Sequence, residues 1–202
     1  NKVKVESKSE RPYIYIGRDS RINSPMLEYS LISGILASGT DVKRLHLTPT
    51  PAVAYLTKST EADMGIMVSA SHNPYYDNGI KIFSGNGLKL RDEEELEIER
   101  AIDDVQVPRA INDKVGIVLN RHESIYQYIE SLFFSVESRF DGIKVGIDCA
   151  NGSTAVIAKR LFARLGAKVT VINDEPNGVN INDNCGATST GQLSKLVVDS
   201  KL

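Results

Sequence analysis

Several features that mark particular classes of protein are rare or missing in this sequence. Only two cysteines, Cys149 and Cys185, occur among its 202 residues, and they form no CxxC pair. A disulfide scaffold is therefore excluded, and we expect reduced thiols and a cytoplasmic location. The three histidines, His46, His72 and His122, lack the spacing of metal ligands, so a zinc site is not expected.

Long hydrophobic runs and an excess of basic charge are missing as well. No stretch approaches the roughly 18 apolar residues of a membrane-spanning helix, and the opening NKVKVESKSE has no signal-peptide core. The formal net charge is −2, whereas a nucleic-acid binder normally carries a basic excess. We therefore expect neither a membrane nor a nucleic-acid partner. The composition that remains, 41% hydrophobic and 25% charged, is typical of a globular protein with one large or two small domains.

Strand and helix patterns alternate along the first half of the chain. Apolar runs predict strands at residues 13–16, 42–47, 65–68 and 79–83. Helical periodicity predicts helices from Ser24 as N-cap to Gly39, from about Pro51, and over residues 92–105. In the last of these, which is strongly acidic, the expected buried stripe consists of Ile98, Ile102 and Val105.

The same plan recurs in the second half. Residues 107–113 have the composition of a domain boundary, and an amphipathic helix is predicted over residues 122–140. The stretch IKVGIDCANGSTAVIAKRLFARLGAKVTVI then repeats the order strand, polar loop, helix, glycine, strand. The predicted fold class is α/β. We expect a three-layer α/β/α domain with a mixed sheet over residues 1–113, followed over residues 114–202 by part of a second domain of related plan.

The segment SASHNPYYDNGIKIF, residues 69–83, gathers polar side chains at the end of an apolar strand. Serine, asparagine and proline are also common in ordinary turns, so a plain turn is one interpretation. A protease-like pair of Ser71 and His72 is disfavoured, because side chains adjacent in sequence rarely reach the geometry of a catalytic triad. A third interpretation is phosphoryl transfer. A hydroxyl at the end of an α/β strand can carry a phosphoryl group whose oxygens are held by neighbouring donors.

Residues 69–83 resemble the phosphoserine loop of the α-D-phosphohexomutase superfamily. The similarity extends over nearly the whole chain and includes GRDSR at 17–21, TPTP at 48–51, DCANG at 148–152 and GVNINDNCGAT at 178–188. The DNGIK continuation of the loop is most similar to members that act on glucosamine phosphates. The resemblance implies a mutase that interconverts glucosamine 6-phosphate and glucosamine 1-phosphate through a phosphoserine enzyme and a bisphosphorylated sugar.

The resemblance also implies roles for individual residues. Ser71 is expected to carry the phosphoryl group, Lys81 to act as general acid/base near the sugar hydroxyl, and His72 to orient or polarise the phosphate. The phosphoserine loop is expected to be supported by Arg18, Arg21 and Asn73.

Simpler interpretations of these residues stay open. Lys81 lies between Ile80 and Ile82, so alternation alone places it on the solvated face of an edge strand. His72 can be a turn histidine that bonds backbone groups. The two arginines can form structural salt bridges with residues such as Asp19.

The resemblance further implies a Mg²⁺ cofactor, a sugar bisphosphate activator and a phosphosugar substrate, and it leaves a homo-oligomer open. The phosphate on Ser71 would be one metal ligand, and an aspartate-rich DGDGDR loop expected beyond residue 202 would supply the others. We therefore expect residues 1–202 to be the N-terminal part of the enzyme and inactive alone. The alternatives are a mutase of the same superfamily that acts on glucose or mannose phosphates, and a non-catalytic binding module.

Overall fold

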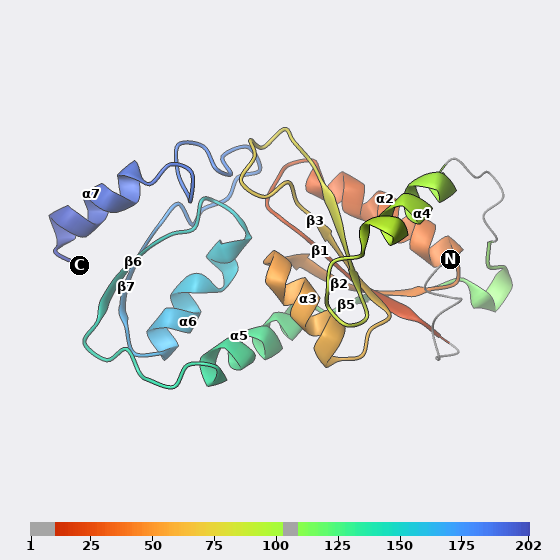
Figure 1. The fold of residues 1–202 in the computed structure, drawn as a ribbon, viewed down its shortest axis with the longest axis horizontal. Helices are drawn as coiled ribbons and strands as arrows, with labels where there is room; N and C mark the ends of the chain where they lie inside the picture. The colour runs from red at the N-terminus through yellow and green to blue at the C-terminus, as the bar shows by residue number, and fades with distance from the viewer. Residues whose placement is uncertain (1–10, 103–108) are drawn as a thin grey trace.

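A mixed five-stranded sheet forms the centre of the first half of the protein (Figure 1). The computed structural model describes residues 11–102 and 109–202. The strand order is β4-β3-β1-β2-β5; only β4 runs antiparallel to its neighbour. The strands are β1 (Tyr13–Arg18), β2 (Asp41–Leu47), β3 (Met64–Val68), β4 (Ile80–Ser84) and β5 (Val118–Asn120).

Helices cover both faces of this sheet, because alternate residues of each strand point to opposite sides. Ile14 and Ile16 of β1 pack with Ile32 of α2 in one core cluster, and Tyr15 packs with Leu56 of α3 in another. Helix α4 lies on the same face as α2, against the first cluster. The predicted three-layer α/β/α arrangement is confirmed for this half. The helix bounds are α2 (Ser24–Ala37), α3 (Thr50–Ser59) and α4 (Asp92–Ile102).

Two details of the predicted helices are wrong. Helix α2 begins at Ser24 with Asn23 as its N-cap, and the Ser24 hydroxyl donates a hydrogen bond to Asp19 at 2.9 Å instead of capping the helix. In α4, Ile98 contacts the core as expected, but Ile102 is 75% exposed because it lies one turn beyond that contact. Val105 of the predicted stripe lies outside the described residues.

The second half contains a two-stranded parallel sheet, β6–β7, with helices beside it (Figure 1). Its elements are β6 (Lys144–Asp148), α6 (Ala158–Arg164), β7 (Lys168–Ile172) and α7 (Gly191–Ser200). Short 3₁₀ turns occur at Asn112–Lys114, His122–Ser124 and Ser153–Val156. None of the helices in the described part of the chain is long and apolar enough to cross a membrane.

The junction between the halves differs from the sequence-based expectation. Residues 118–120 were expected beyond the boundary at 113, yet they form β5 and pair with β2 of the first sheet. Helix α5 (Ile125–Phe134) ends six residues before the predicted end at 140. It ends early because the chain turns back, and the Phe140 amide bonds the Leu165 carbonyl at 2.8 Å. Tyr128 and Ile129 of α5 pack against both halves.

Candidate functional site

The loops that leave β1, β2 and β3 meet at one edge of the first sheet. The backbone amide of Asp19, after β1, donates to the carbonyl of Val68 at the end of β3, and the amide of Thr48, after β2, donates to the carbonyl of Arg18. These three strands are parallel, so their carboxyl ends lie together, which is where α/β sheets place their ligands. The serine loop, defined here as residues 69–79, leaves β3 at this edge and leads into β4.

Ser71 is exposed and adopts a left-handed backbone conformation, with φ of +59°. Its amide donates to the hydroxyl oxygen of Ser69 at 3.1 Å, and the Asn73 amide closes the turn on the carbonyl of Ala70. A residue with a Cβ is held in this region only where its surroundings enforce it, at a cost of about 1–3 kcal/mol. The local contacts of the serine loop therefore matter for where the Ser71 hydroxyl points.

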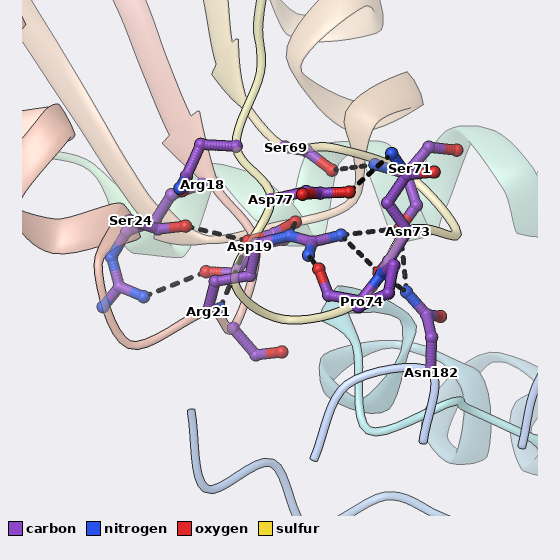
Figure 2. Close-up of polar contacts among 12 residues, drawn as sticks. Arg18, Asp19, Arg21, Ser24, Ser69, Ser71, Asn73, Pro74, Asp77 and Asn182 are labelled. Carbon is purple, nitrogen blue, oxygen red and sulfur yellow. Dashed lines mark hydrogen bonds and ion pairs between the residues drawn. The ribbon is translucent and has the colours of Figure 1, made fainter. Parts of the chain in front are cut away.

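Arg21 contacts the serine loop through the backbone carbonyl groups of the loop (Figure 2). Its side chain is buried and donates to the carbonyl of Ser71 at 3.0 Å, to that of Asn73 at 3.1 Å and to that of Pro74. Its Nε donates to the buried Asp19 carboxylate at 2.9 Å, which fixes the plane of the guanidinium. The five donors of the planar guanidinium suit such a multiple contact. The structure thus brings Arg21 to the loop and also pairs it with Asp19.

Arg18 does not reach the serine loop directly. It donates to the carboxylate of Glu28 at 3.2 Å and to the backbone carbonyl of Asp19 at 3.1 Å. Glu28 is fully buried and also accepts two hydrogen bonds from Arg44, at 2.9 and 2.8 Å. Arg18 is therefore part of an ion triad around the buried Glu28, and it contacts the site through the Asp19 backbone.

The other residues singled out in the sequence take different places. His72 is exposed in the serine loop. The Asn73 side chain donates to Asp77 across the loop at 3.0 Å (Figure 2). Lys81 is partly buried on β4, in register with Met67 of β3. Within residues 11–102 and 109–202, no side-chain hydrogen bond is found for His72 or Lys81.

A cleft of about 410 Å³ is lined by residues of the serine loop and of the second half of the protein. The first half contributes Asp19, Ser69 and Ser71 to its lining, and the second half contributes Cys149, Ser153 and Asn182. Burial raises the pKa of the Cys149 thiol to about 11, and the carboxylates of Asp174 and Asp148 add to the shift. The thiol is therefore neutral at physiological pH and is not a nucleophile there.

Asn182 contacts the serine loop, and the sequence-based reasoning did not single it out. Its side-chain amide donates to the carbonyl of Ser71 at 3.0 Å and to that of Asn73 at 2.9 Å (Figure 2). Its own backbone is left-handed, with φ of +60°. The signal available in the sequence was the asparagine-rich run NINDN, since asparagine tolerates this conformation better than most residues.

A complete metal site is not found in the described part of the chain. Among residues 11–102 and 109–202, no three histidine, cysteine, aspartate or glutamate side chains come close enough to hold an ion. The exposed hydroxyl of Ser71 beside the cleft would fit a single oxygen ligand once it carried a phosphoryl group.

The fold agrees with that of known proteins. Residues 3–108 match the family model of the alpha/beta/alpha domain I of phosphoglucomutase/phosphomannomutase, and the chain belongs to this family. A phosphoglucomutase/phosphomannomutase family protein from Burkholderia thailandensis has a similar structure, with a TM-score of 0.76 and 24% identity. That similarity covers 88% of this chain and 38% of the other.

Two of the relatives that the chain matches have a more specific name than that of the family. The phosphoglucosamine mutase of Brevibacillus brevis is 47% identical over 193 residues, which cover 95% of this chain and 43% of the relative. The phosphoglucosamine mutase of Lachnoclostridium phytofermentans is 47% identical over 197 residues, which cover 96% of this chain and 44% of the relative. The chain thus spans less than half the length of these relatives.

Proposed function

We propose that this chain is part of a phosphosugar mutase that interconverts glucosamine 6-phosphate and glucosamine 1-phosphate. The similarity to phosphoglucosamine mutases supports the substrate. The observation that carries the reaction type is the placement of Ser71. Its hydroxyl lies beside a cleft at the carboxyl end of the sheet, and its left-handed backbone is held by the buried Arg21.

The proposed reaction begins with a phosphoryl group on the Ser71 oxygen. The bond between phosphorus and Oγ breaks, a bond to a sugar hydroxyl oxygen forms, and the hydroxyl proton passes to a base. The bisphosphorylated sugar then turns over and returns its other phosphoryl group to the same serine. In such a transfer the charge spreads over the phosphoryl oxygens, so positioning and electrostatic stabilisation supply most of the catalysis.

We propose the following roles for the residues of the site. Lys81 is the acid/base, and His72 orients the phosphate. Arg21 and Asn73 hold the loop in shape through their bonds within it. Arg18 supports it less directly, through the carbonyl of Asp19.

The remaining parts of the proposal concern the cofactors and the whole protein. Mg²⁺ would supply counter-charge for a phosphoserine of about −1.5 to −2. The phosphate on Ser71 would give one of its ligands. A sugar bisphosphate would prime the serine, and the enzyme would work in the cytoplasm.

We place the boundary between the two domains after β5, because β5 pairs within the first sheet.

The test is a coupled mutase assay of the full-length protein with glucosamine, glucose and mannose 6-phosphates in turn. We expect the highest kcat/KM for glucosamine 6-phosphate. A clear preference for glucose or mannose would contradict the proposed substrate. The absence of turnover with all three sugars would contradict the proposed reaction.

A further inference from the structure

Two side chains from opposite halves of the protein bind the same two carbonyl groups of the serine loop. Arg21 reaches the Ser71 and Asn73 carbonyls from the first half at 3.0 and 3.1 Å. Asn182 reaches the same carbonyls from the second half at 3.0 and 2.9 Å (Figure 2). Each carbonyl oxygen has two lone pairs and can accept both donors. The backbone on both sides of His72 is therefore held from two directions.

Asn182 is itself firmly placed. Its backbone amide donates to the Ala150 carbonyl at 2.9 Å, which ties it to the loop after β6. The surrounding segment docks on the first half at two further points. The Ile22 amide donates to the Gly178 carbonyl at 2.8 Å, and the Ser20 hydroxyl donates to the Asn151 carbonyl at 2.6 Å. The side chain of Asn182 thus contacts the serine loop when the second half is docked against the first half.

The hydrogen bonds from Arg21 and Asn182 hold the backbone conformation that sets the direction of the Ser71 hydroxyl oxygen. Ser71 is left-handed, and a relaxed backbone would leave this region and turn the hydroxyl elsewhere. Arg21 alone holds the carbonyls from one side, so the loop can still move away from the cleft. The second donor, on the cleft side, opposes that movement.

We propose that Asn182 is a positioning residue that holds Ser71 in its reactive orientation and makes that orientation depend on the docking of the second half. This inference rests on the proposed phosphoryl transfer at Ser71. Asn182 acts on the serine backbone and is not assigned a contact with the sugar. Its loss should therefore lower kcat and leave KM for the sugar phosphate nearly unchanged.

The first test compares Asn182→Asp with Asn184→Asp in the full-length protein. The two asparagines lie in the same segment with similar left-handed backbones, φ of +60° and +51°, and aspartate tolerates this region too. The Asn184 side chain donates to Asp183 and not to the serine loop. We expect kcat to fall about 10- to 100-fold for Asn182→Asp and less than about 2-fold for Asn184→Asp. Equal effects would overturn the proposal.

A second measurement does not depend on catalysis. Hydrogen–deuterium exchange of peptides covering residues 69–79 should become about 5-fold faster or more in Asn182→Gly, and it should not change in Asn184→Gly. Glycine removes the donor without adding charge and accepts the left-handed backbone. Unchanged exchange in Asn182→Gly would overturn the inference even if the mutase activity is established. If exchange is faster in Asn182→Gly but the wild-type protein has no mutase activity, the positioning contact is retained and the proposed function is rejected.

Discussion

Ser71 and Ser69 are two serines of one loop with opposite surroundings. Ser71 is exposed beside the cleft, whereas Ser69 is buried and accepts a hydrogen bond from the Ser71 amide. We expect Ser71→Ala to abolish both turnover and covalent phosphate, because the accepting oxygen is removed. Ser69→Ala should retain phosphate on Ser71. Peptide mass spectrometry of the full-length protein measures both, and phosphate found on Ser69 would reject the assignment.

Lys81 is the residue whose role the structure supports least by direct contact. If it is the acid/base, Lys81→Met should lower kcat by about 10²–10⁴-fold while phosphate remains on Ser71. Steady-state kinetics together with intact-mass measurement tests this. The matched control is Lys89→Met, which removes an exposed lysine that pairs with Glu95. Wild-type turnover in Lys81→Met would mean that Lys81 is an ordinary strand lysine without a catalytic role.

Cys149 gives a prediction about stability and pH. Both cysteines are free and buried, and the pKa of Cys149 is raised to about 11 from an ordinary value of 9.0. A raised pKa in the folded state gives stability that is present below pH 9 and is lost as the pH rises to about 11. The loss should be about 2 kcal/mol of unfolding free energy. Urea unfolding at pH 8 and pH 11 should show a smaller loss in Cys149→Ala than in wild type; equal losses would contradict this origin.

At the scale of elements, the ion triad of the buried Glu28 with the partly buried Arg18 and Arg44 joins α2 to β1 and β2. Removing the charge of Glu28 would leave two arginines facing a buried neutral group. We expect Glu28→Gln to lower the free energy of unfolding by about 3–5 kcal/mol. Urea titration measures the change, and Glu99→Gln on the exposed face of α4 should have almost no effect. A loss below about 1 kcal/mol for Glu28→Gln would show that the triad adds little stability.

The elements that the sequence predicted well are those with a strong local pattern. The apolar run that forms β3 is buried along its whole length, and it is visible without knowledge of the fold. Strand β5 was missed because its three residues, Val118–Asn120, carry no periodicity and become a strand only by pairing with β2. The end of α5 was missed for a similar reason, since the Phe140–Leu165 backbone contact decides it.

The residues of the candidate site were predictable from the sequence where their pattern is local. The motif around Ser71 is such a pattern, so the sequence alone singled it out as a candidate. The hydrogen bond from the Asn182 side chain to the Ser71 carbonyl joins residues 111 positions apart, and no local sequence pattern encodes such a contact. The distinction between Arg18 and Arg21 also depends on three-dimensional packing, because the two lie only three residues apart at the end of β1, yet Arg18 binds Glu28 and Arg21 binds the serine loop.

At the scale of the whole molecule, the two halves approach closely at Gly178. Its backbone is left-handed, with φ of +98°, and an added Cβ would lie 3.1 Å from the Cβ of Ile22. We expect Gly178→Ala to cost about 1–3 kcal/mol of stability and to speed hydrogen exchange of the Ile22 amide, which bonds the Gly178 carbonyl. Thermal unfolding and exchange by NMR measure these effects.

Gly142→Ala is the matched control for this substitution. Gly142 also has a positive φ, +83°, but an added Cβ would meet nothing within 4 Å. It should show the backbone cost without faster exchange at Ile22. If both variants left the Ile22 amide unchanged, the contact at Gly178 would not hold the two halves together.

The contact between Asn182 and the serine loop also sets an order of events during synthesis. A ribosome adds Asn182 to the chain 111 residues after Ser71. At about 5–20 residues per second, the interval is about 5 to 20 s. During that time β1, β2 and β3 can already pair, while the carbonyl groups of the serine loop are bound by Arg21 without Asn182. The nascent chain therefore contains Ser71 before Asn182 can bind the backbone beside it, so the proposed site is completed only after β1, β2 and β3 have been synthesised.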